Sequence, residues 1–117
     1  MQACTFPSDR FTLVMLTHKR PAFLRRALQY YKDFPGRLLV LDSSPEPVAG
    51  IVERFPRVDY QHLPQFNYRG FQAKIKYGLG LVTTPYVAMV ADDDFILVDA
   101  IARSVAFLEA VSYTHLR

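Results

Sequence analysis

The chain has 117 residues, of which 50% are hydrophobic and 21% are charged. These values indicate one folded domain with a sizeable core and exclude a disordered chain. No apolar run approaches the ~20 residues that a membrane-spanning helix needs, and the first ten residues lack the pattern of a signal peptide. With one cysteine, no internal disulfide is possible, so we expect a cytoplasmic protein, including a peripheral position at the inner face of a membrane. The net charge of +3 suits an anionic ligand, although dispersed surface charges explain it equally well.

The hydrophobic pattern predicts strands that alternate with helices. Residues 11–17 form a short, almost continuous apolar run, as a central parallel strand does, and Pro21 suits the first turn of a helix that ends before Pro35-Gly36. The further strands are expected at residues 38–41, 58–63 and 86–91, and the further helices at residues 48–55, 70–82 and 98–110. The strand at 58–63 alternates and is expected to be more exposed, whereas the strand at 86–91 is expected to be buried.

Apolar stripes at helical spacing predict which helix faces lie against the sheet. The residues expected to point inward are Phe23, Leu24, Ala27, Leu28, Tyr31 and Phe34 in the first helix, Phe71, Ile75, Gly78, Leu79 and Val82 in the third, and Ile101, Val105 and Leu108 in the last.

This alternation predicts an α/β fold with a Rossmann-like parallel sheet and right-handed crossovers. If the first three strands step outward in the order 3-2-1, the fourth must pass to the other side of the first, which gives the order 3-2-1-4. A crevice is expected at the switch point between strands one and four. We expect residues 17–20 and 92–94 to line it, with residues 42–44 next along the same rim.

Three consecutive carboxylates, Asp92, Asp93 and Asp94, follow the fourth predicted strand. Carboxylates at the end of a buried strand are costly unless a cation or hydrogen-bond donors neutralise them. Mg²⁺ typically takes one or two protein carboxylates and completes its shell with water and phosphate oxygens. The cluster therefore predicts a metal or nucleotide site, while an acidic turn that caps the next helix is the structural alternative.

Taken together, the motifs resemble the nucleotide-binding half of family-two glycosyltransferases of the GT-A fold. The segments that carry the resemblance are residues 12–21, 38–44, Gly70 with Ala73-Lys74, and residues 86–95. The resemblance covers residues 11–110 and implies an inverting enzyme with a nucleotide-sugar donor, a UDP-sugar in the first instance, and a divalent Mn²⁺ or Mg²⁺ ion. The acceptor is expected to be a sugar, a glycan or a lipid-linked hydroxyl, and no nucleic-acid partner is expected.

The same resemblance implies roles for particular residues. Thr17 and Asp42 correspond to the residues that contact the nucleoside, Asp92 to one that faces the ribose or the metal, and Asp94 to the metal ligand. The family usually has an aromatic residue shortly after its Asp-x-Asp motif, and here Phe95 follows the acidic cluster immediately. The alignment of the three aspartates with that motif is therefore open, and Asp93 is included among the donor-binding residues. Lys74 most nearly matches the basic residue near the diphosphate, with Arg69 and Lys76 as alternatives. Arg20 would add positive charge near the phosphates.

Structural roles compete with several of these assignments. Thr17 could cap the first helix, Asp42 has the surroundings of an ordinary turn before Pro45, and Lys74 could be a solvated helix residue.

The chain also departs from the family, because the half that carries the acceptor site and the catalytic base is absent. No catalytic base is therefore assigned, and the chain is expected to be a fragment that is inactive alone. We expect residues 1–10 to be an N-terminal extension and residues 111–117 a non-native or disordered tail.

Three other protein classes share features with this sequence. A non-catalytic α/β module that binds a nucleotide or a partner remains the alternative. A receiver domain or a haloacid-dehalogenase-type phosphatase needs acidic residues after strand one, where this chain has residues 17–20, Thr-His-Lys-Arg.

Overall fold

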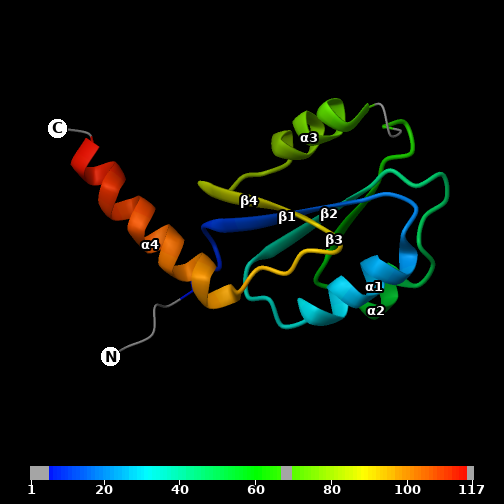
Figure 1. Cartoon of the computed structure of the whole chain (residues 1–117), viewed down its shortest axis with the longest axis horizontal. Helices are drawn as coiled ribbons and strands as arrows, with labels where there is room; N and C mark the ends of the chain where they lie inside the picture. The colour runs from blue at the N-terminus through cyan, green and yellow to red at the C-terminus, as the bar shows by residue number, and fades with distance from the viewer. Residues whose placement is uncertain (1–5, 67–69, 116–117) are drawn as a thin grey trace.

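The computed structural model describes residues 6–66 and 70–115 of the chain, which form four strands and four helices (Figure 1). The strands are β1 (Phe11–Thr17), β2 (Arg37–Asp42), β3 (Asp59–His62) and β4 (Tyr86–Ala91). The helices are α1 (Pro21–Tyr30), α2 (Ile51–Arg54), α3 (Phe71–Gly80) and α4 (Val98–His115). Among the described residues, no helix is long and apolar enough to cross a membrane.

The four strands form one parallel sheet in the order β3-β2-β1-β4, which confirms the predicted Rossmann-like α/β architecture. β1 is central and pairs with β2 on one side and with β4 on the other. The carboxyl ends of β1 and β4 therefore lie next to each other, and the switch point falls where the strand order predicted it.

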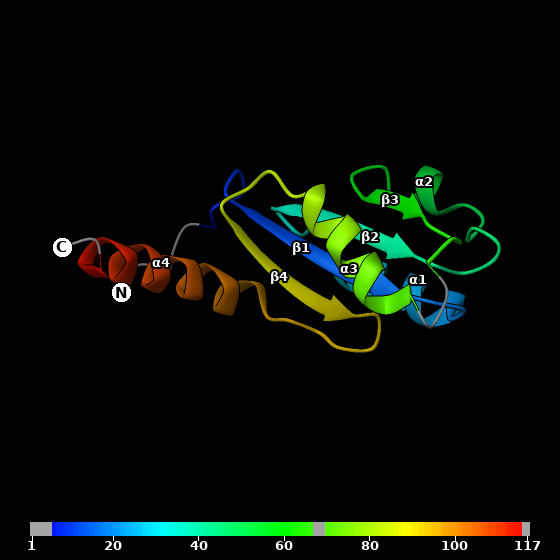
Figure 2. The same ribbon diagram turned by 90° about the horizontal axis from the view of Figure 1, so that it is seen from above.

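Helices cover the two faces of the sheet unequally (Figure 1). One core contains side chains of α1, α2 and α4 packed on one face of the sheet, including Leu24, Ile51 and Ile101. A smaller core on the other face is built on Val14 and Leu39, under α3. Seen from above, α3 crosses β1 and β2, while β4 lies to one side of it (Figure 2).

Gly78 allows α3 to approach β2 closely. A Cβ atom at this position would lie 2.2 Å from the Cδ1 atom of Leu41, whereas a Cβ at Gly80 would meet nothing within 4 Å. Such a close approach is possible only for a residue without a side chain.

The expectation that β4 is buried is wrong for one of its faces. In one cross-strand row, Leu39 and Val14 are fully buried, but their neighbour Met89 is 38% exposed. Val87, two residues earlier on the same face of β4, is also exposed. β4 is an edge strand that α3 does not reach, and its apolar composition did not reveal this.

The helices differ from their predictions at several points. The buried residues of α3 are Lys74 and Gly78, whereas Phe71 and Leu79 of the predicted stripe are exposed. Phe23 of α1 and Leu108 of α4 are exposed as well.

The last helix is also longer than expected. α4 continues to His115 instead of ending near residue 110, so residues 111–115 of the expected tail are helical. Residues 1–5 of the expected extension and residues 116–117 lie outside the described residues.

Candidate functional site

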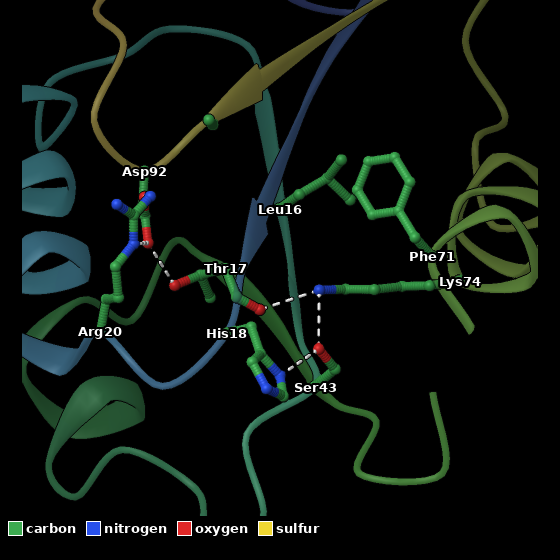
Figure 3. Close-up of a pocket in the computed structure, with 9 residues that line it drawn as sticks. Leu16, Thr17, His18, Arg20, Ser43, Phe71, Lys74 and Asp92 are labelled. Carbon is green, nitrogen blue, oxygen red and sulfur yellow. Dashed lines mark hydrogen bonds and ion pairs between the residues drawn. The ribbon is translucent and has the colours of Figure 1, made fainter. Parts of the chain in front are cut away.

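A cavity of about 700 Å³ opens at the carboxyl ends of β1, β2 and β4, beside α3 (Figure 3). This volume is in the range of small-molecule sites, and the lining combines polar and apolar side chains. The lining residues are Leu16, Thr17, His18, Arg20, Ser43, Phe71, Lys74, Ala91 and Asp92. The structure thus brings together four of the seven predicted site residues, Thr17, Arg20, Lys74 and Asp92.

Asp92 is the buried anion of the cavity, with no exposed surface. The Thr17 hydroxyl donates to Asp92 Oδ2 at 2.7 Å, and Arg20 Nε donates to the same oxygen at 3.2 Å. Arg20 Nη2 pairs with Asp92 Oδ1. Both carboxylate oxygens therefore have donors, which is what a buried charge requires. Thr17 serves this contact, and the cap position of α1 is Arg20, so the capping alternative for Thr17 is wrong.

Lys74 supplies a second cation on the opposite side of Thr17 (Figure 3). It is only 3% exposed, so the alternative of a solvated helix residue is wrong. Its Nζ donates to the Thr17 carbonyl oxygen at 2.8 Å and to Ser43 Oγ at 3.0 Å. Burial lowers the pKa of Lys74, and the carboxylates of Asp42 and Asp92 oppose this shift. Of the alternatives, Lys76 is exposed, and Arg69 lies outside the described residues.

Asp42 is fully buried as well, but it is not one of the residues that line the cavity. Its Oδ1 accepts from the Ser44 backbone N–H at 2.9 Å and from Ser44 Oγ at 2.6 Å, and its Oδ2 accepts from the Tyr60 hydroxyl. Burial, followed by this hydrogen bond to Asp42, raises the pKa of Tyr60 to about 12. These contacts give Asp42 the structural role that its turn-like surroundings suggested, since they join the loop after β2 to β3.

Asp93 and Asp94 lie outside the cavity with exposed side chains. Asp93 Oδ2 is 3.6 Å from Arg20 Nη1. The backbone oxygen of Asp94 accepts from the Tyr31 hydroxyl at 3.4 Å, which ties this loop to the end of α1.

The acidic cluster does not fit a divalent metal centred on Asp92. Both oxygens of Asp92 are engaged by Thr17 and Arg20, and an ion bound there would lie beside a guanidinium of like charge. Within residues 6–66 and 70–115, no three His, Cys, Asp or Glu side chains come together as metal ligands. The Mn²⁺ or Mg²⁺ ion expected at Asp92 and Asp94 stays a prediction that this geometry does not favour.

Five lining residues of the cavity were not among the predicted site residues: Leu16, His18, Ser43, Phe71 and Ala91. His18 Nδ1 lies 2.8 Å from Ser43 Oγ, which also accepts from Lys74. A signal for His18 and Ser43 was present, because both belong to segments that were expected along the rim of the crevice, residues 17–20 and 42–44. Phe71, by contrast, is 52% exposed at the cavity wall, and its place in an apolar stripe wrongly predicted a core residue.

Comparisons with models of protein families, with curated proteins and with solved structures found no match to this chain. The cavity and its side chains are therefore the basis for any functional assignment.

Proposed function

We propose that the chain is the donor-binding half of a glycosyltransferase and that the cavity binds a nucleotide sugar for transfer to an acceptor hydroxyl. The observation that carries this proposal is the placement of Arg20 and Lys74 on either side of Thr17, at the switch point of a parallel sheet. Ligands of open α/β sheets bind in that crevice. Two cations in one cavity suit a diphosphate, since charge-assisted bonds to phosphate oxygens are strong.

The remaining lining suits the rest of such a ligand. Thr17, His18 and Ser43 carry groups that hydrogen-bond ribose hydroxyls or base edges. The exposed ring of Phe71 offers an apolar wall against which a base or a sugar can stack. These contacts would hold a nucleoside without a contribution from the internally satisfied Asp42.

Sugar transfer leaves a nucleoside diphosphate, on which negative charge builds as the anomeric bond breaks. Fixed positive charge at that position stabilises the transition state. Arg20 and Lys74 are the residues that would supply it. Inversion also needs a base for the acceptor hydroxyl, and we assign that role to none of the described residues.

Isothermal titration calorimetry with UDP tests the proposal. Lys74→Met keeps most of the side-chain volume and removes the ammonium, so UDP affinity should fall roughly tenfold or more, as expected for a charge-assisted bond. Lys76→Met, on the exposed side of the same helix, is the matched control and should bind like the wild type. Circular dichroism establishes that both variants are folded. Equal affinities of the two variants, or no binding of UDP by the wild type, would rule the proposal out.

A further inference from the structure

Arg20 already occupies the position where a divalent ion would be needed. Asp92 is fully buried, and a buried carboxylate needs a cation close to it. Arg20 meets this need with Nε and Nη2 on the two oxygens of Asp92, and the Thr17 hydroxyl completes the shell. A paired geometry of this kind is specific to the planar guanidinium and is not available to a lysine ammonium.

The chain also holds Arg20 in this position. Lys19, just before it, has the left-handed φ of 55°, and its backbone N–H donates to Ser44 Oγ at 2.7 Å. This anchors the turn between β1 and α1 to the loop after β2. The guanidinium of Arg20 also lies 4.8 Å from the centre of the exposed Phe23 ring on α1, a cation–π contact.

Arg20 has donors beyond those that contact Asp92. A guanidinium carries five N–H donors in a fixed fork, and the side chain of Arg20 is 41% exposed. Nη1 points toward the exposed Asp93 at 3.6 Å, a contact that a stronger anion can replace. Arg20 can therefore keep its bonds to Asp92 and still donate to a phosphate oxygen.

The described lining residues present more cationic than anionic side chains to a ligand. The cavity lining contains Arg20 and Lys74 as cations and Asp92 as the only carboxylate of the described lining residues. Asp42, whose charge acts on Lys74, and Asp93, which contacts Arg20, lie outside the lining, so two cations and one carboxylate face the cavity. A divalent ion bound at Asp92 would lie beside the like charge of Arg20.

The geometry points to Arg20 as the built-in replacement for a divalent cation, so that the cavity binds the diphosphate of its nucleotide without metal. This inference rests on the proposed nucleotide-binding function. It departs from the metal expectation drawn from the sequence and makes Arg20, together with Lys74, the group that neutralises the phosphates.

The test is calorimetry of the full chain with UDP, first with EDTA and then with Mn²⁺. The wild type should bind UDP with affinities that agree within about threefold in the two conditions, a negligible free-energy difference. Arg20→Ala should bind at least roughly tenfold more weakly in EDTA, because it loses a charge-assisted donor and leaves Asp92 unpaired. Mn²⁺ should partly restore that variant, since Asp92 is then free to hold an ion.

Two controls sharpen the result. Arg25→Ala removes an exposed arginine from the next turn of α1 and should leave UDP binding unchanged. Titration of Mn²⁺ alone, followed by electron paramagnetic resonance, should show more bound ion with Arg20→Ala than with the wild type.

The outcomes separate the two proposals. Wild-type binding that is lost in EDTA and restored by Mn²⁺ would overturn the replacement of metal by Arg20 and leave nucleotide binding intact. Absence of UDP binding in both conditions would overturn both.

Discussion

The two strands that flank β1 each have a buried aspartate at the carboxyl end, but the two aspartates have different partners. β2 ends at Asp42, and Asp92 directly follows β4; neither carboxylate has any exposed surface. In the described part of the chain, the carboxylate of Asp42 accepts from Ser44 and Tyr60, and Asp42 lies outside the cavity. Asp92 lines the cavity and holds the partly exposed Arg20. Burial alone therefore does not distinguish the two carboxylates; their partners and their position relative to the cavity do.

The strands differ along their length as well. Side chains of β2 are buried on both faces, whereas Val87 and Met89 of β4 are exposed on the face that α3 leaves open. We therefore expect the β2 side to determine stability and the β4 side to determine binding.

The largest effect should come from a charge placed in the shared row of side chains. Leu39→Asp puts an unpaired carboxylate in the core, a cost of several kcal/mol that should unfold the chain. Met89→Asp, in the same row but 38% exposed, should cost about 1 kcal/mol or less. Far-ultraviolet circular dichroism and urea unfolding compare the two. Similar losses in both would mean that β4 is as well covered as β2.

The next effect separates the two buried aspartates. Asp42→Ala leaves donors of Ser44 and Tyr60 without their acceptor and should lower the free energy of unfolding by about 3 kcal/mol. Asp92→Ala should cost less, about 2 kcal/mol, because it leaves the buried Thr17 hydroxyl without its acceptor while the partly exposed Arg20 can be hydrated instead. Urea denaturation measures both values. The reverse order would assign the structural role to Asp92.

A smaller effect tests the contact of α3 with β2. Gly78→Ala forces a Cβ against Leu41 and should destabilise the chain by about 2 kcal/mol. Gly80→Ala, near the end of the same helix with open space around its Cβ, should instead stabilise it by about 0.5 kcal/mol. Thermal unfolding of the two variants gives the comparison. Equal shifts in melting temperature would show that α3 does not approach β2 closely.

The smallest effect is in the pH dependence of stability. In the folded chain the pKa of Tyr60 is raised to about 12, above its ordinary value of about 10. The neutral phenol therefore stabilises the fold fully below pH ~10, and this contribution is lost as the pH rises toward 12. The loss should be about 1 kcal/mol, since the phenol is partly exposed.

Lys74 acts in the opposite direction on the cavity side. Burial lowers its pKa below the ordinary value of 10.5, so the charged ammonium reduces the free energy of unfolding at lower pH. This loss of stability disappears as the pH rises toward 10.5 and the ammonium loses its proton. Urea midpoints of the wild type, Tyr60→Phe and Lys74→Met across this range separate the two contributions. A wild-type profile that Tyr60→Phe leaves unchanged would contradict the role of the Asp42 contact.

The fold could be predicted from the sequence because its signals are local. The apolar runs and helix breakers located the four strands of the described residues, and the assumption that the first three step outward as 3-2-1 placed the fourth beside the first, as observed. What the pattern could not show is which faces are covered. Met89 and Phe71 are apolar at positions that suit a core, yet both are exposed, because α3 covers β1 and β2 but not β4.

The site was predicted in outline for the same reason: residues that follow parallel strands meet at one edge. Thr17 and Asp92 were brought together in this way. The partner of Asp92 could not be predicted, because the guanidinium of Arg20 reaches it across a turn whose shape depends on the φ of Lys19. Burial of Lys74 likewise depends on the tilt of α3, which the sequence does not report.

The most direct test of the account is to locate bound UDP by amide chemical shifts in the ¹⁵N-labelled chain. The account predicts that the largest changes fall on Thr17, His18, Ser43, Lys74 and Asp92. A second cavity, of about 210 Å³ and lined in part by Lys32, Arg54 and Arg57, lies near the opposite edge of the sheet and also offers positive charge. Shifts that concentrate there, with the residues around Thr17 unchanged, would contradict the assignment of the donor site.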